Sequence, residues 1–229
     1  MHSRKLKEFS DEIKYKNRNP RNIELLKQID NIEDNPTFII QPETILYRSR
    51  KVETDLNTID SEPGFHGYNS LGSFVAPPLK TKDMRANYRF IPYLYVASSK
   101  RLSVKEIRPE EGDSISVASI IVDEDLTVFD LRQIKNISAN RNVKDSFLID
   151  LAELYSKPVD TSEDQIEYIP TQFIAEYIKQ LDYDGIIYPS SLGDDKNIDY
   201  NIVVFNYDKC HAISSEIVGI MGGEICQSS

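Results

Sequence analysis

Helix-like and strand-like segments follow one another along this 229-residue chain without the regular alternation of a doubly wound sheet. Strand patterns cover residues 43–50, 91–97, 114–122, 126–131, 186–188 and 201–206, and helix patterns cover 4–34, 145–155 and 171–181. A turn-rich stretch at 52–84 is predicted to be a long loop. With 40% hydrophobic residues, the chain can bury one sizeable core. This irregular mixture predicts an α+β domain with a mixed sheet, flanking helices and an N-terminal helical extension.

Composition excludes several classes of function. Two cysteines, Cys210 and Cys226, and three scattered histidines offer neither a disulfide framework nor a metal site. The pI of about 4.9 argues against direct nucleic-acid binding. No apolar run approaches the roughly 20 residues needed to cross a bilayer, and the charged N-terminus lacks a signal core. We therefore expect a cytoplasmic protein that binds no metal, membrane or nucleic acid.

A basic segment stands out against this acidic background. Residues 80–108 contain eight basic and two acidic residues, a local charge of +6 in a chain whose net charge is −10. Such a segment suggests a small anionic ligand, although a solvated basic face is the alternative. The chain has no P-loop, no GxGxxG sequence and no GxSxG sequence, so the usual phosphate-binding and hydrolase signatures are missing.

Three separated motifs carry a family resemblance. They are LYRSR around Arg48, then RAN from Arg85 followed by PYLYVA and Glu106 with IRP after it, and finally DGIIYPSS around Ser190. In this order, over roughly residues 43–209, they resemble the RES domain, a family of bacterial toxins from toxin–antitoxin pairs. The resemblance implies an ADP-ribosyltransferase-like fold and an enzyme that consumes NAD⁺. It also implies a RES domain at 43–222, after an N-terminal extension at 1–42 and before a C-terminal tail at 223–229.

One part of the motif departs from the family pattern. The family usually has Gly before the Arg-x-Asn turn and a Pro-x-Gly turn after it. This chain has Met84 and then Tyr88-Arg89-Phe90 at those places. We therefore expect a turn that is built differently, with the tyrosine and glutamate positions still in register.

Cleavage of the nicotinamide–ribose bond requires an anion clamp, an aromatic wall and a carboxylate beside developing positive charge. Arg48 suits the clamp, because a guanidinium offers bidentate donors to phosphate oxygens; the alternative is a surface arginine beside Arg50. Tyr93 and Tyr95 are two residues apart in a strand, so alternation places both rings on one face and cannot choose between them. The resemblance assigns Tyr95 to the site, although a tyrosine of the core would have the same pattern.

The remaining site residues are also taken from the motifs. Glu106 is the expected catalytic carboxylate, with a surface ion pair to a neighbouring cation as the alternative. Ser190, or else Ser191, is expected to form hydrogen bonds, because no histidine is placed to make it a nucleophile. By analogy with the family, Arg85 and Asn201 are expected substrate contacts.

Two functional classes remain open from the sequence. The first is an NAD⁺-degrading toxin enzyme that takes NAD⁺ as substrate, needs no cofactor and is held in check by a cognate antitoxin. Its reaction could be hydrolysis, phosphorolysis or ADP-ribosylation of a protein. The second is a non-enzymatic module that binds a nucleotide or a partner. A homodimer is the default expectation for its assembly.

Overall fold

The protein is built on one nine-stranded sheet. The computed structural model describes residues 4–20, 26–30, 36–52, 67–132, 146–156, 165–193 and 199–227. The strand order is β1-β5-β6-β7-β3-β2-β4-β8-β9, and all neighbours are antiparallel except β5 and β6. The strands are β1 (Thr37–Ile40), β2 (Ile45–Lys51), β3 (Leu94–Ala97), β4 (Ser114–Val122), β5 (Leu126–Asp130), β6 (Gly185–Pro189), β7 (Tyr200–Val204), β8 (Cys210–Met221) and β9 (Glu224–Gln227).

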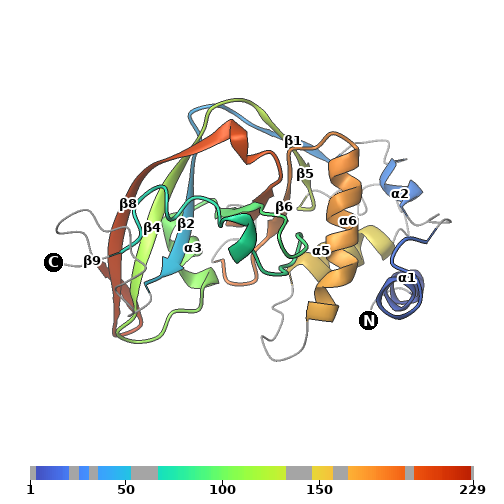
Figure 1. Ribbon diagram of the computed structural model, residues 1–229, viewed down its shortest axis with the longest axis horizontal. Coiled ribbons are helices and arrows are strands. Elements are labelled where there is room, and N and C mark those ends of the chain that lie inside the picture. Colours follow the sequence, from blue (N-terminus) through green and yellow to red (C-terminus); the bar gives the residue numbers. More distant parts are fainter. Residues whose placement is uncertain are drawn as a thin grey trace.

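Most helices gather at one end of the molecule (Figure 1), while α3 lies against β2 and β4 on the other half. The helices are α1 (Arg4–Tyr15), α2 (Lys27–Asp30), α3 (Lys100–Glu106), α5 (Ser146–Ser156) and α6 (Ile169–Gln180), with 3₁₀ turns η2 (Pro78–Lys80), η3 (Gln165–Tyr168) and η4 (Tyr207–Lys209). Parallel neighbours need a crossover connection, and the chain between β5 and β6 includes α5, η3 and α6. This crossover brings helices over the sheet.

Alternation along the strands divides the apolar residues between two cores. Ile186 and Tyr188 of β6 face a core shared with α1, α5 and α6, whereas Ile187 between them faces the second core. That second core joins residues of β2 and β4 to residues of β5, β6 and β7, so the two halves of the sheet share it. A smaller cluster seals Val104 of α3 against β4 and β8. These contacts fix α3 over one half of the sheet.

The α+β class predicted from the sequence is confirmed, and β4 has the predicted bounds. The predictions that fall on residues 21–25, 31–35 and 53–66 lie outside the described residues. The two edge strands of the sheet, β1 and β9, lie before residue 43 and after residue 222. None of the described helices has the length and apolar character needed to cross a membrane.

Candidate active site

Glu106 lies in the last turn of α3, a helix that the sequence patterns did not reveal. Ser99 caps the start of this helix by accepting a hydrogen bond from the backbone N–H of Leu102 at 3.2 Å. The chain leaves the helix at Arg108, whose positive φ of 47° is uncommon for a residue other than glycine. A carboxylate at the C-terminal end of a helix opposes the helix dipole. The position of Glu106 is therefore better explained by the groups it meets than by helix stability.

The Glu106 carboxylate is held by two side chains, one from the residue that follows β6 and one from β7. Its Oε1 accepts a hydrogen bond from Ser190 Oγ at 2.5 Å and from Asn201 Nδ2 at 2.6 Å. Ser190 Oγ in turn accepts from the backbone N–H of Leu192 at 2.9 Å. Among the described residues, Glu106 thus has these neutral partners instead of the ion pair considered from the sequence. Since both bind Oε1, the carboxylate is oriented, and none of the same residues forms a hydrogen bond with Oε2.

The structure brings all six predicted site residues to the wall of one cavity of about 410 Å³. This volume falls within the range of small-molecule sites, about 300–1,000 Å³. The predicted residues that line it are Arg48, Arg85, Tyr95, Glu106, Ser190 and Asn201. They come from β2, the Arg-x-Asn turn, β3, α3, the end of β6 and β7. Residues that are far apart in the sequence therefore form a single site.

Arg48 makes contacts that the sequence did not reveal. Its guanidinium donates hydrogen bonds to the backbone carbonyls of Ser73 at 2.7 Å and Phe74 at 2.6 Å. Burial, and then the nearby charge of Arg50, lower the pKa of Arg48 from its ordinary value to about 10, so it is still a cation at neutral pH. None of the described residues gives Arg48 an acidic partner. An anionic ligand in the cavity would offset this desolvated charge.

Tyr95 fixes the turn that carries Arg85. Its hydroxyl donates to Asn87 Oδ1 at 2.7 Å and accepts from the backbone N–H of Ala86 at 3.1 Å. Burial raises the pKa of Tyr95 well above its ordinary value, so the hydroxyl stays neutral and does not serve as a base. The ring lines the cavity while the hydroxyl holds the turn.

Helix α6 also holds the turn, through two buried polar residues that the sequence interpretation missed. Thr171 Oγ1 donates to the Arg85 carbonyl at 2.5 Å, and Gln172 Nε2 donates to the Met84 and Asn87 carbonyls, each at 2.9 Å. The Asn87 side chain is itself fully buried. Although the turn departs from the family pattern at Met84 and Tyr88–Phe90, it is therefore held by hydrogen bonds from Tyr95, Thr171 and Gln172. Only the Arg-x-Asn spacing indicated it in the sequence.

The geometry distinguishes the residues between which the sequence left a choice. Tyr93 belongs to the core shared with α1, α5 and α6, and Tyr95 packs against that core, so the two rings lie on one face as alternation predicted. The Tyr93 hydroxyl, however, donates to Glu176 at 2.5 Å, and Tyr93 does not line the cavity. Ser190 is buried and bonded to Glu106, whereas Ser191 beside it is exposed. Tyr95 and Ser190 are therefore the better candidates.

Four further tyrosines that were not predicted as site residues also line the cavity. They come from β2, α5, η3 and β6, and are Tyr47, Tyr155, Tyr168 and Tyr188. Burial raises the pKa of Tyr188 to about 12, although the nearby charge of Arg85 acts in the opposite direction. These rings suit a flat ligand, although the Tyr155 hydroxyl already donates to the Thr171 carbonyl at 2.7 Å. Their spacing in the sequence gave no signal, because only the fold brings them together.

Tyr95→Phe tests whether this hydroxyl has a structural role. Its loss leaves Asn87 Oδ1 and the Ala86 N–H without their partner, which should lower the free energy of unfolding by about 1–3 kcal/mol. Urea denaturation measures this loss. The exposed Tyr15 supplies the control, since Tyr15→Phe should leave stability unchanged. Unchanged stability in the Tyr95 variant, together with lost activity, would instead indicate direct action on a substrate.

Comparisons with known proteins identify the family. The model of the RES domain matches residues 61–222, a region that includes five of the six site residues and begins after Arg48. The fold also resembles a chain in the crystal structure of the M. tuberculosis MbcT–MbcA toxin–antitoxin complex. That likeness has a TM-score of 0.45 and 16% identity over 86% of this chain and 93% of that chain, too weak to support a functional argument. No curated protein matches the chain. Because the family match spans more than half of its length, the chain belongs to the RES-domain family.

Proposed function

We propose that this protein is an enzyme that cleaves the nicotinamide–ribose bond of NAD⁺. The observation that carries the proposal is the Glu106 carboxylate, oriented by Ser190 and Asn201 at the wall of a cavity that is also lined by three arginines, among them Arg48 and Arg85. The arginines suit a pyrophosphate, and the tyrosines suit a flat ring. Membership of the RES-domain family supports the same substrate.

The residues would divide the reaction between them. The bond from ribose C1′ to the nicotinamide nitrogen breaks with its electron pair on the nitrogen, leaving positive charge on the ribose. Glu106 stabilises that charge, because a preorganised anion is most effective where charge develops in the transition state. Ser190 donates to Glu106 and accepts from a backbone N–H, so it acts as a positioning group and not as a nucleophile. The oxygen of the acceptor then bonds to C1′ and loses a proton to solvent.

The acceptor decides which reaction results. Water gives ADP-ribose, phosphate gives ADP-ribose phosphate, and a protein side chain gives an ADP-ribosylated protein. All three share the same bond cleavage. The alternative is a nucleotide-binding module without catalysis. One observation favours it: the side chains of Arg48 and Tyr95 both form hydrogen bonds with the protein's own loops, so they also have a structural role.

The biological role belongs to the same proposal. As an NAD⁺-degrading toxin, the protein would act in the cytoplasm, where NAD⁺ is found, and would require a cognate antitoxin while it is held inactive. The resemblance of its motifs to the RES family supports this role. A homodimer, a RES domain at about 43–222 and an appended N-terminal helical segment are part of the proposal.

One incubation tests the activity. Purified protein is mixed with NAD⁺, with and without inorganic phosphate, and the products are identified by mass. We expect free nicotinamide in both mixtures, with ADP-ribose or its phosphate as the second product. Intact NAD⁺ together with measurable NAD⁺ binding would instead support the nucleotide-binding module.

A further inference from the structure

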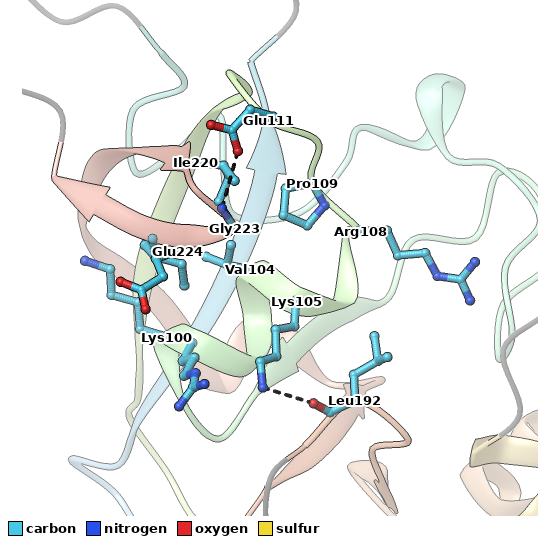
Figure 2. A pocket seen from close by; sticks show the side chains of 12 residues that line it. Lys100, Val104, Lys105, Arg108, Pro109, Glu111, Leu192, Ile220, Gly223 and Glu224 are labelled. Atoms are coloured by element: carbon cyan, nitrogen blue, oxygen red, sulfur yellow. Dashed lines mark hydrogen bonds between the residues drawn. The ribbon is translucent and has the colours of Figure 1, made fainter.

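A second cavity, of about 970 Å³, lies between α3 and the β8–β9 hairpin (Figure 2). Two of the cations that line it are already engaged by the protein itself. Lys100 is ion-paired with Glu216 at 2.7 Å, and Lys105 Nζ donates to the Leu192 carbonyl at 3.4 Å. This cavity therefore gives no indication of a ligand. The contacts that extend the candidate active site lie at the other end of the molecule, where most helices gather (Figure 1).

Helix α1 packs on the helices that support the candidate active site, although it precedes the residues that match the family. Its three buried residues are Leu6, Phe9 and Ile13. The Phe9 ring packs edge-on against Phe173 of α6, with 5.7 Å between the ring centroids. Because α6 holds the turn that carries Arg85, a segment outside the family match is part of the scaffold of the site.

One charged side chain of α1 is directed at the protein. The Lys14 side chain is only 10% exposed, and its ammonium group is ion-paired with the Glu167 carboxylate at 2.7 Å. A desolvated cation depends on its partner much more than an exposed cation does. Lys16 illustrates the difference, since its side chain is 69% exposed and it pairs at 3.8 Å with Glu12 of the same helix. The Lys14 pair, in contrast, joins α1 to a segment 153 residues further along the chain.

That segment is η3, which leads directly to the candidate active site. Glu167 precedes Tyr168, which lines the cavity. The Thr171 hydroxyl is shared between the Tyr168 carbonyl at 2.9 Å and the Arg85 carbonyl at 2.5 Å. Arg85 lines the same cavity. The ion pair therefore lies one residue from one wall of the site and is linked to another wall by hydrogen bonds.

We propose that Lys14 is a positioning residue, which through Glu167 holds Tyr168 and the Arg85 turn where they bind the substrate. The carboxylate of Glu106 and its two hydrogen-bond partners come from other elements. Loss of the ion pair should therefore weaken substrate binding and leave the bond-breaking step unchanged. The effect on binding rests on the proposed cleavage of NAD⁺, whereas the effect on the local structure does not.

Lys14→Met keeps the aliphatic stem and removes the ammonium group. It should raise the KM for NAD⁺ by roughly 3- to 30-fold, the scale for residues that act through others, and leave kcat nearly unchanged. Lys14→Arg can still pair with Glu167 and should keep the wild-type KM. Lys16→Met makes the same chemical change two residues further along α1 and should alter neither constant. A fall in kcat at unchanged KM, or equal effects of Lys14→Met and Lys16→Met, would overturn the proposal.

The partner residue supplies an independent variant. Glu167→Met removes the other half of the pair at a side chain that is 47% exposed, so this variant should fold even if Lys14→Met does not. It should raise the KM to the same extent. The double variant should be no worse than either single one, because both changes remove one and the same interaction. Additive losses would show that the two residues act separately and would contradict the proposal.

Hydrogen–deuterium exchange tests the positioning without a substrate. In Lys14→Met, the backbone amides of residues 84–90 and 165–172 should exchange faster than in the wild type, while those of β4 in the other half of the sheet should keep their protection. Lys16→Met should show no change. Unchanged exchange in the two segments, or faster exchange throughout the sheet, would overturn the proposal. If the protein does not cleave NAD⁺, this measurement still decides whether Lys14 holds the two segments.

Discussion

Glu106→Gln is expected to lower NAD⁺ turnover by about 100-fold or more, the scale for losing one preorganised electrostatic group. The glutamine oxygen can still accept hydrogen bonds from Ser190 and Asn201, so the shape of the site should survive. What disappears is the negative charge that stabilises the transition state. Binding of NAD⁺ should stay within a few-fold, because the charge develops only as the bond breaks. Single-turnover kinetics and calorimetric titration measure the two effects separately.

Glu110→Gln is the matched control for this variant. Glu110 is an exposed glutamate that lies outside the candidate cavity, four residues after Glu106 in the sequence. Its replacement makes the same chemical change and should alter neither turnover nor binding. Full activity in the Glu106 variant would show that Glu106 is not the catalytic carboxylate.

Arg48→Ala is expected to weaken NAD⁺ binding by about 1.5–3 kcal/mol, the range for a hydrogen bond to a charged group. This corresponds to roughly 10- to 150-fold in the dissociation constant. The guanidinium is partly desolvated, as its lowered pKa of about 10 indicates, and among the described residues it has no acidic partner to weaken its pull on a pyrophosphate. Isothermal titration of the variant with NAD⁺ measures the change.

Because Arg48 also holds the carbonyls of Ser73 and Phe74, its loss could act through the loop instead of the charge. Arg50→Ala separates the two causes. Arg50 donates to the Gly72 carbonyl at 3.2 Å and stacks on the Tyr68 ring at 3.6 Å, but it does not line the candidate cavity. We expect this variant to disturb the loop and to leave NAD⁺ affinity nearly unchanged. Equal losses in both variants would assign Arg48 to the loop.

Local patterns were sufficient for much of the fold. The apolar alternation at 114–122 and the helical stripe at 171–181 correspond to β4 and α6 within two residues, because their side chains face a core with the period of each element. Alternation also placed Tyr93 and Tyr95 on one face. Helix α3 was missed because its seven residues depend on the Ser99 cap and on packing against β2 and β4. Strand β8 was missed because its pairing with β4 makes it a strand despite a mixed sequence.

The sequence by itself determined which chemical groups are available. Its motifs named an arginine, a tyrosine, a glutamate and a serine, and its composition offered no cluster of metal ligands. Only the tertiary structure decided what those groups contact. Ser190 and Asn201 reach Glu106 across 84 and 95 residues of chain, and Arg48 and Tyr95 turn out to support loops as well as line the cavity. Local propensity acts over a few neighbouring residues, whereas contacts across such separations depend on strand order and on helices packed against the sheet.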